Sequence, residues 1–167
     1  MYLFLLFAGL LFLVFYGGMH EAPFAPTRKK DVHNFTSLAK IKEGDRVVDL
    51  GCGDGRLLFA CASRGAFVHG YEIALVPYLI VLWRRMFSKD RERIKITYGS
   101  FWKADLGGAD VIYFFLMPEA YKRVREKIEQ EVKEGTRVAC YAWPVKEWEL
   151  AGKKKEKNSL GTYLYQF

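Results

Sequence analysis

Two hydrophobic periodicities alternate along most of the chain. Short apolar runs, rich in valine, isoleucine and aromatic residues and typical of buried strands, cover Arg46–Leu50, Phe67–Ile73, Ile94–Gly99, Ala109–Leu116 and Thr136–Trp143. Apolar residues at helical spacing are found in Asp31–Ile41, Leu57–Ser63, Leu75–Phe87 and Glu119–Val132. Strands that alternate with helices predict an α/β fold, in which helices cover both faces of a doubly wound, mainly parallel sheet.

The pattern changes after Trp143, where the helical spacing ends. We expect a strand near Trp148 and a last one at Leu160–Phe167, with the lysine cluster Lys153–Lys157 between them. A closing antiparallel hairpin fits this arrangement best. We interpret the lysine cluster as a solvated loop, with contact to lipid as the lesser alternative.

The first 18 residues, MYLFLLFAGLLFLVFYGG, contain no charged side chain. As a helix this run would be roughly 27 Å long, which just spans the hydrocarbon core of a bilayer. No basic residue precedes the run and no convincing small-residue cleavage site follows it, so we favour a membrane anchor over a cleaved signal peptide. We therefore predict a transmembrane helix at 1–18, a linker at 19–28 and one compact domain at 29–167.

The charge distribution is consistent with a domain beside a membrane. The net charge is +7, and no charged side chain precedes Glu21, so the whole excess belongs to the part after the apolar run. Attraction to an anionic lipid bilayer is the first interpretation and nucleic-acid binding the second, while a merely solvated basic surface is as good as either. Arg28, Lys29 and Lys30 follow the apolar run, and the positive-inside rule then places the domain on the cytoplasmic side.

Cysteine and histidine usage predicts no metal site. The three cysteines are widely spaced and lie in apolar or glycine-rich segments, a pattern that makes neither a disulfide framework nor a zinc site and indicates a reducing compartment. The three histidines share no ligand spacing, and we interpret them as polar surface or linker residues.

The segment VVDLGCGDGR, residues 47–56, carries the strongest functional signal. Gly51, Gly53 and Gly55 follow a predicted buried strand and precede a helix, which is where doubly wound sheets bind ligands against the backbone. A dinucleotide fingerprint needs a further glycine where Arg56 stands. Asp49, at the end of the strand, would repel a pyrophosphate but suits the cationic amino-acid end of S-adenosylmethionine (SAM). The pattern therefore favours SAM over NAD.

Three further residues are candidates for the cofactor site. Glu72 ends the second strand, 21 residues after Gly51, where a carboxylate can accept hydrogen bonds from both ribose hydroxyls. Asp54 either caps the following helix or touches the ligand, and capping is the more common role. Cys52 is interpreted as a small residue of the loop without special reactivity.

These residues resemble a known family. DLGCGDG and the YEI of residues 71–73 match the first two motifs of class I SAM-dependent methyltransferases. A narrower resemblance is carried, in order, by APFAPT (22–27), DGR (54–56), GYE (70–72), FWKADL (101–106) and VAC (138–140) followed by an aromatic-proline pair and Trp148. Together these segments are similar to the membrane-anchored protein lysine methyltransferases of mitochondria, which modify the ATP synthase c subunit and the adenine nucleotide translocase, and to their short prokaryotic relatives. The resemblance runs from about Glu21 to Phe167.

The resemblance implies a seven-stranded Rossmann-like sheet and SAM as cofactor. The residues that it places at the cofactor are Asp49, Gly51, Gly53 and Glu72, and we add Cys52, Asp54 and Ser100 as neighbours. Many relatives have an acid after the third strand to bind the adenine amino group, where this chain has Gly99-Ser100. Ser100 can still form a hydrogen bond, but a weaker one.

Transfer to a lysine amine would require a particular pocket. With a pKa near 10.4, the amine is neutral at pH 7 only at a cost of about 4.6 kcal/mol. An apolar aromatic pocket disfavours the charged form, and we expect it at Phe24, Tyr113, Phe114, Phe115 and Trp143, although aromatics in strands are usually core. Glu119 is a candidate proton acceptor, with service at a helix N-terminus as the alternative.

The combined interpretation is a single-pass membrane protein whose domain methylates a lysine of a membrane-associated protein. A lipid head group or small amphiphile is the first alternative substrate, and a SAM-binding scaffold without turnover is the second. The segment Leu116-Met117-Pro118-Glu119 lacks the Asn/Asp-Pro-Pro-aromatic signature of enzymes that methylate adenine or glutamine amides. We therefore expect no nucleic-acid partner.

Overall fold

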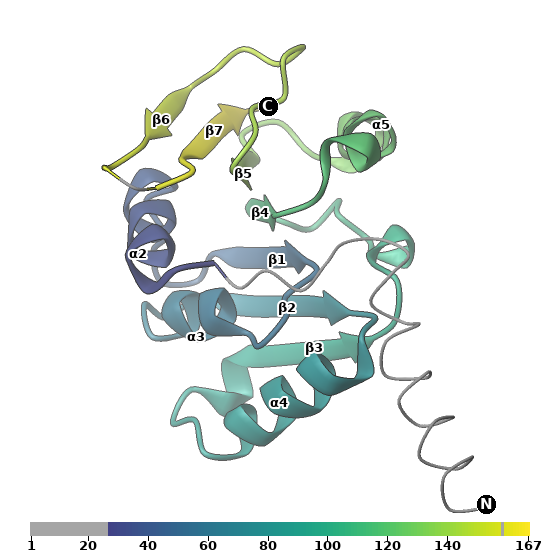
Figure 1. The fold of residues 1–167 in the computed structure, drawn as a ribbon. Coiled ribbons are helices and arrows are strands. Elements are labelled where there is room, and N and C mark those ends of the chain that lie inside the picture. Colours follow the sequence, from purple (N-terminus) through teal and green to yellow (C-terminus); the bar gives the residue numbers. More distant parts are fainter. Residues whose placement is uncertain (1–26, 158) are drawn as a thin grey trace, which may run out of the picture.

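A computed structural model describes residues 27–157 and 159–167, which form one α/β domain (Figure 1). Its seven-stranded sheet has the order β3-β2-β1-β4-β5-β7-β6. The strands are β1 (Arg46–Leu50), β2 (Phe67–Glu72), β3 (Ile94–Tyr98), β4 (Val111–Phe114), β5 (Arg137–Tyr141), β6 (Gly152–Lys154) and β7 (Thr162–Gln166). The first five are parallel, whereas β7 runs antiparallel to β5 and β6 antiparallel to β7. The predicted mainly parallel sheet with a closing hairpin is confirmed.

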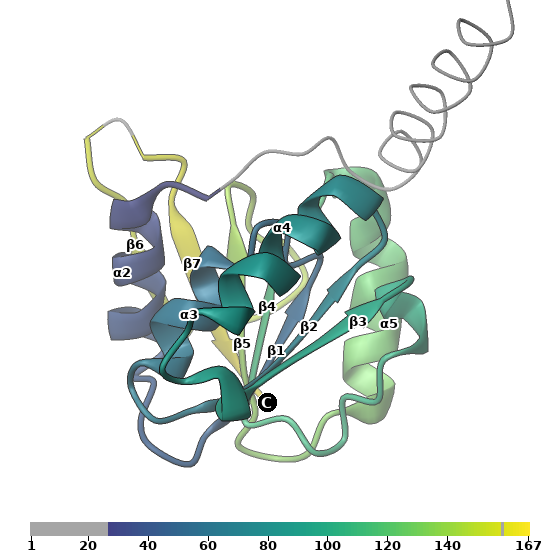
Figure 2. The same ribbon diagram turned by 90° about the horizontal axis from the view of Figure 1, so that it is seen from below.

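Helices cover both faces of the sheet, as Figures 1 and 2 show. The described helices are α2 (Lys29–Leu38), α3 (Arg56–Ala62), α4 (Leu75–Met86) and α5 (Tyr121–Glu131), with one-turn 3-10 helices η1 (Arg91–Arg93), η2 (Phe101–Lys103) and η3 (Pro118–Ala120). On one face lie α2, α3 and α4, and on the other lies α5 (Figure 2). Strand order reverses between β1 and β4, so the ends of these two strands mark the topological switch point.

Two apolar cores result from the alternation of side chains along the strands. On β1, Val47 joins the cluster beneath α2 and α3, which contains Phe35 and Leu58. Its neighbour Val48 points to the opposite cluster, which contains Ile128 of α5. Because both faces of the central strands are buried, these strands read as continuous apolar runs in the sequence.

The C-terminal part differs from the sequence prediction. Trp148 lies in the loop between β5 and β6, not in a strand. Its ring packs 4.9 Å from that of Phe167, and its indole N–H donates to Glu129 at 2.7 Å, so both the apolar ring and the polar nitrogen are satisfied outside the sheet. The edge strand β6 instead includes Lys153, whose ammonium lies over the ring of Tyr163. The expectation that the whole lysine cluster is a loop is therefore wrong for Lys153 and Lys154, which belong to β6. Lysine is common in short edge strands because its charge discourages pairing with another chain.

Several elements are shorter than predicted. Strand β5 ends at Tyr141 because Ala142 adopts φ of 78°, a left-handed conformation that interrupts the ladder. The helix expected from Glu119 begins at Tyr121 instead, after the single turn of η3. These differences shift element ends by a few residues and leave the topology unchanged.

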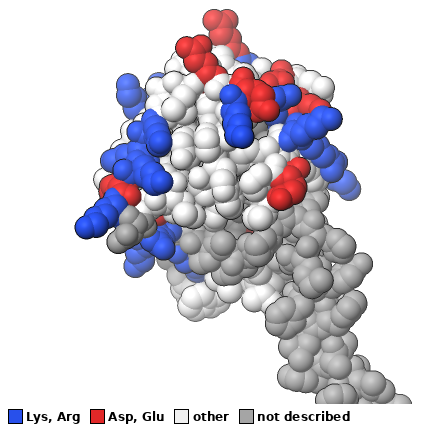
Figure 3. All heavy atoms as spheres, turned by 45° about the horizontal axis from the view of Figure 1, so that its top comes forward, with Lys and Arg blue, Asp and Glu red and all other residues white. Residues whose placement is uncertain are grey.

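The sequence predicts a transmembrane helix and a positively charged domain surface. No helix within residues 27–157 and 159–167 is long and apolar enough to cross a membrane, and the predicted anchor at 1–18 lies outside the described residues. In the space-filling view of Figure 3, Lys and Arg side chains are interspersed with Asp and Glu around the rim of the visible face. The middle of that face is uncharged, so the positive excess is not gathered there.

Candidate functional site

The loop Gly51–Gly55 forms the floor of the candidate site, at the carboxyl end of β1. Gly51, Gly53 and Gly55 have φ values of 99°, 55° and 76°, all in the left-handed region that favours glycine. The backbone N–H groups of Gly51 and Cys52 both donate to the carbonyl of Tyr71, at 3.1 and 2.9 Å. The loop therefore turns sharply at the switch point, with its backbone open to a close approach by a ligand.

Glu72 is buried at the end of β2 and holds this loop in place. Its Oε2 accepts a hydrogen bond from the backbone N–H of Gly53 at 2.8 Å, and its Oε1 accepts one from Ala74 at 2.7 Å. Each carboxylate oxygen retains a lone pair with which it can accept a bond from a ligand hydroxyl. The structure brings Glu72 to the glycine loop, as the sequence predicts, while its contact with ribose stays a prediction.

Asp49 lies beside the loop with one oxygen unpaired. Its exposed fraction is 2%, and Oδ1 has no hydrogen-bond partner in the part of the chain that the structure describes. Burial, and then the negative charge of Glu72, raises the pKa of Asp49 from 3.8 to about 8. A cation bound nearby would supply the missing partner and favour the ionised carboxylate. The residue therefore suits the ammonium end of SAM.

Cys52 is packed below the loop against Gly70. A Cβ at position 70 would lie 2.7 Å from Sγ of Cys52 and 2.6 Å from Cδ1 of Leu58, so the strand needs glycine there. Burial, followed by the charges of Asp49 and Glu72, raises the pKa of the Cys52 thiol well above its usual value. The structure agrees with a small, unreactive loop residue. Its contact with the cofactor stays a prediction.

Asp54 pairs with two arginines. Its carboxylate lies 2.8 Å from Arg56 and 3.2 Å from Arg84, whereas the N-cap position of α3 is Gly55 and receives no side-chain cap. Burial pushes the pKa of Asp54 up, but the hydrogen bond and charges of the two guanidinium groups outweigh it and hold the pKa below 3.8. Asp54 is therefore not the N-cap residue of α3, and its carboxylate binds two guanidinium groups instead. Its contact with the cofactor stays a prediction. Arg56 also donates to the carbonyl of Thr27 at 2.8 Å, which ties the segment before α2 to the loop.

Ser100 follows β3, next to the strand that carries Glu72. Its Oγ accepts a hydrogen bond from the backbone N–H of Trp102 at 3.4 Å and caps η2. Gly99 before it has φ of 147°, so this turn also depends on glycine. The proposed contact of Ser100 with adenine stays a prediction.

An aromatic cluster lies at the carboxyl ends of β4 and β5. The ring of Phe115 lies 4.9 Å from that of Tyr141, edge to face, and 6.1 Å from that of Trp143. Trp143 is 38% exposed, so one side of the cluster is open to solvent. The hydroxyl of Tyr121 donates to the carbonyl of Trp143 at 2.9 Å and supports this turn. Phe115 and Trp143 thus come together as predicted, joined by Tyr141.

Tyr113 and Phe114 are core residues. Tyr113 is 3% exposed; its ring lies 4.8 Å from Phe35 and its hydroxyl 3.1 Å from Oγ1 of Thr27. Phe114 points to the opposite face, 5.5 Å from the ring of Tyr121. Since successive residues of an extended chain point to opposite faces, Tyr113 and Phe114 do not share one pocket. Contact between Tyr113 and substrate stays a prediction, and Phe24 lies outside the described residues.

Asp31 is a buried acid that the sequence interpretation missed. Its carboxylate accepts hydrogen bonds from the hydroxyls of Tyr141 at 2.7 Å and Ser159 at 2.6 Å. Through Tyr141 it supports the aromatic cluster from the side of α2. The available signal was an acid in the first turn of a helix, which ordinarily indicates only a favourable charge at the N-terminus.

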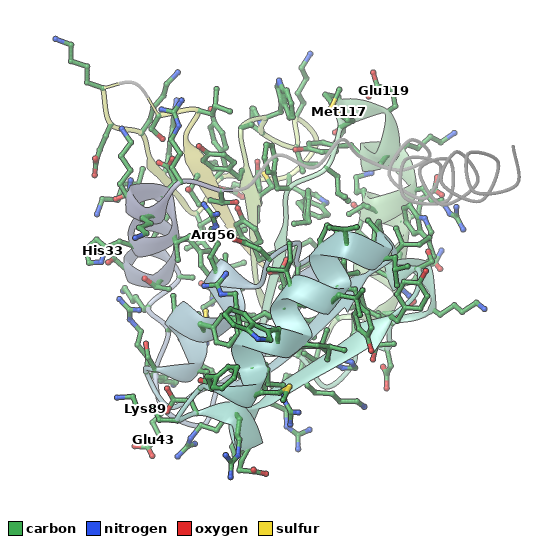
Figure 4. All side chains as sticks on the ribbon, turned by 60° about the horizontal axis from the view of Figure 1, so that its bottom comes forward. His33, Glu43, Arg56, Lys89, Met117 and Glu119 are labelled. Carbon is green, nitrogen blue, oxygen red and sulfur yellow. The ribbon has the colours of Figure 1, made fainter. Side chains whose placement is uncertain are left out.

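Glu119 is exposed and lies in η3, at the N-terminal end of α5. Figure 4 shows it with Met117 at one end of the molecule, while Lys89 and Glu43 lie at the opposite end. The position agrees with the helix-terminus alternative. Its role as a proton acceptor stays a prediction.

The residues that the structure describes contain no group of His, Cys, Asp and Glu side chains able to hold a metal ion. His33 points away from α2 in Figure 4 and is exposed, in agreement with a surface role. The buried cysteines at 52, 61 and 140 are free thiols.

The fold and the site define a class I SAM-dependent methyltransferase. An RNA methyltransferase from Salinibacter ruber, solved with S-adenosyl-L-homocysteine, superposes with a TM-score of 0.80 and 24% identity over 85% of this chain and 93% of that one. A SAM-dependent methyltransferase from Thiobacillus denitrificans, solved with the same product, gives 0.61 with 15% identity, over 78% of this chain and 54% of that one. At these identities the structures show the fold.

The chain belongs to the family of the ANTKMT methyltransferase domain, whose sequence model matches residues 49–151. A protein-lysine N-methyltransferase of Saccharolobus islandicus is 30% identical over 77% of this chain and 81% of its own length. The human lysine N-methyltransferase of the ATP synthase c subunit is 28% identical over 75% of this chain. That match covers 54% of the human protein, so this chain spans about half of it.

The described residues suit SAM. The unpaired oxygen of Asp49 can accept a cation, the left-handed glycines keep side chains out of the loop, and Glu72 offers carboxylate lone pairs at the end of the strand beside β1. When bound, SAM supplies a methyl group attached to a sulfonium. The leaving group is a neutral thioether, so the transfer requires no covalent help from the protein. The reaction requires the protein to bind and align the reactants and to exclude water.

Proposed function

We propose that this chain transfers the methyl group of SAM to the side-chain amine of a lysine in a membrane-associated protein. The observation that carries the proposal is the similarity to the protein-lysine N-methyltransferase of Saccharolobus islandicus, which extends over most of both chains. Other relatives are named as lysine N-methyltransferases of the ATP synthase c subunit and, in mouse, of adenine nucleotide translocase.

The proposed roles follow from the geometry of the described residues. Asp49 pairs with the ammonium group of SAM, and Glu72 accepts hydrogen bonds from the ribose while it holds Gly53. Ser100 contributes a weaker contact near the adenine. The open side of the cluster formed by Phe115, Tyr141 and Trp143 receives the lysine side chain.

The aromatic cluster also addresses the charge of the lysine. Desolvation against apolar rings disfavours the ammonium form and lowers the free energy needed to reach the nucleophilic amine. Tyr141 is suited to the inner wall of such a pocket because it is buried and Asp31, which Ser159 also contacts, fixes its hydroxyl. Tyr113 and Glu119 are the secondary candidates, for substrate contact and for proton acceptance respectively.

Tethering is the second part of the proposal. The uncharged run at 1–18 supports a membrane anchor, and Arg28, Lys29 and Lys30 support a domain on the cytoplasmic side. An enzyme and a substrate confined to one membrane meet at a higher effective concentration than in solution.

Mass spectrometry of membrane fractions tests this function. Membranes from a strain without the gene are compared with membranes from a strain that carries the wild-type gene or a Glu72→Ala variant. We expect lysine peptides to gain multiples of about 14 Da only with the wild type. Methylated lipid species in place of such peptides would assign the enzyme to a lipid head group instead. If calorimetry detects no SAM binding to the wild-type protein, the proposed activity is excluded.

A further inference from the structure

The outward face of α4 is entirely apolar. The helix and the residue after it expose large hydrophobic side chains at Leu75 (40%), Val76 (42%), Leu79 (53%), Ile80 (41%), Trp83 (63%), Met86 (66%) and Phe87 (73%). Only Pro77 and Val81 of this helix are buried. At 100° per residue the exposed positions share one arc of the helix, and no charged residue falls within that arc.

This arrangement reverses the usual pattern of a surface helix, whose polar face points to water. Single exposed hydrophobic residues are ordinary, but a contiguous apolar patch on one helix marks a contact surface. The opposite side of α4 packs on β2 and β3, so the exposed arc does not belong to the core of the domain. A surface of this kind is typical of a site that a partner covers.

The charges at the border of this arc identify the kind of partner. Residues 84–91, at the C-terminal end of α4 and just beyond it, contain four Lys or Arg and one Asp. Lys89 is exposed just beyond the C-terminus of α4, whereas Arg84 is engaged by Asp54. Aliphatic side chains, Trp83 and Phe87 on one face and basic residues beside them are the combination by which an amphipathic helix lies in the interface of an anionic bilayer.

We propose that α4 is a membrane-docking helix, which lies parallel to the bilayer with its apolar arc among the acyl chains of anionic phospholipids. The N-terminus of α4 follows Glu72 by three residues, so this end of the helix is next to the candidate site. The other end of the helix is followed by Lys89, which lies at the opposite end of the molecule from Glu119 (Figure 4). With α4 on the bilayer, the ends of the parallel strands open beside the membrane surface rather than away from it. The proposal does not depend on the identity of the methyl acceptor.

Site-directed spin labelling of the full chain tests the docking. Because Cys52, Cys61 and Cys140 are buried, a nitroxide reagent will react selectively with a cysteine placed on the surface. We choose Leu79→Cys, in the middle of the apolar arc, and as the matched control Lys122→Cys, exposed on α5. Both proteins are reconstituted in phosphatidylcholine vesicles that contain phosphatidylglycerol, and the collision rates with oxygen and with a water-soluble nickel chelate are measured.

We expect the label at 79 to collide with oxygen and not with nickel, and the label at 122 to show the reverse. Access of nickel to position 79 would overturn the proposal. Shielding from both reagents would mean that residues 1–26 cover α4, and spin-spin broadening would mean that a second copy does; either result also overturns it. In a Trp83→Glu, Met86→Glu background, whose fold is checked by circular dichroism, the label at 79 should lose its contact with lipid.

Discussion

The carboxylate of Glu72 lies 2.8 Å from the backbone nitrogen of Gly53. The acid that the sequence assigns to the ribose therefore also fixes the loop that approaches the rest of the cofactor. One side chain couples the ends of β1 and β2, so its loss should affect loop geometry and ligand contact together.

The first prediction concerns Glu72→Gln. The amide retains one acceptor oxygen but presents N–H groups to one of the two backbone donors, Gly53 or Ala74, which then loses its bond. We expect a loss of about 1 to 3 kcal/mol in the free energy of unfolding, and SAM binding weakened by about tenfold or more. Chemical denaturation and calorimetry measure the two effects. Lys122→Gln, exposed on α5, is the control that should change neither.

The second prediction concerns the pH dependence at Asp49. Since burial raises its pKa from 3.8 to about 8, the folded protein holds this proton more tightly than the unfolded chain does. The free energy of unfolding is therefore greatest below pH 3.8 and declines as the pH rises toward 8, by about 6 kcal/mol in total. Asp49→Asn removes this decline. Melting temperatures of the two proteins should diverge between pH 4 and pH 8, with the variant more stable at the alkaline end.

SAM binding should favour the ionised form of Asp49, whereas folding favours its protonated form. A cation beside Asp49 favours the carboxylate, so binding at pH 7 should release a proton from the wild type. Calorimetry in two buffers of different ionisation enthalpy measures this release. Asp49→Asn should release none and bind SAM more weakly, and equal affinity in the two proteins would remove Asp49 from the cofactor site.

The features that could be predicted from sequence are those that depend on local patterns. The loop Gly51–Gly55 and the acids Asp49 and Glu72 stand at fixed positions relative to strands whose valine-rich runs are readily recognised. The hydrogen bond from Tyr141 to Asp31 joins residues 110 positions apart, and no local pattern indicates it. The same holds for the pairing of Asp54 with Arg84, which depends on how α4 lies against the loop Gly51–Gly55.

Periodicity also locates a helix better than it orients one. The sequence Leu75–Phe87 predicts α4 correctly, but apolar residues occur around most of its circumference, so the buried side is not evident. The edge strand β6 is missed for a related reason. Its three residues, Gly152–Lys154, contain two lysines and no apolar alternation.

A pair of glycine substitutions tests the packing of the cofactor loop. Gly55 and Gly44 have similar φ values, 76° and 82°, so alanine costs roughly 1 kcal/mol of backbone strain at either position. A Cβ at Gly55 would collide with Val81 Cγ2, whereas at Gly44 it meets nothing within 4 Å. We expect Gly55→Ala to lower the free energy of unfolding by a further 1 to 3 kcal/mol, roughly, and to weaken SAM binding, while Gly44→Ala leaves binding unchanged. Equal losses of stability would show that α4 yields at Val81.

The last prediction concerns the aromatic cluster, and two tryptophans provide a matched pair of variants. Trp143 is 38% exposed beside Phe115, whereas Trp148 packs against Tyr165 and Phe167 away from the cluster. If the cluster receives the lysine, Trp143→Ala should lower kcat/KM for a protein substrate by about tenfold or more with little change in Tm, because a contact made at the reacting amine is lost. Trp148→Ala should lower Tm through lost packing and leave kcat/KM per folded molecule unchanged. Unchanged turnover in the Trp143→Ala protein, with SAM affinity intact, would place the lysine channel elsewhere on the domain.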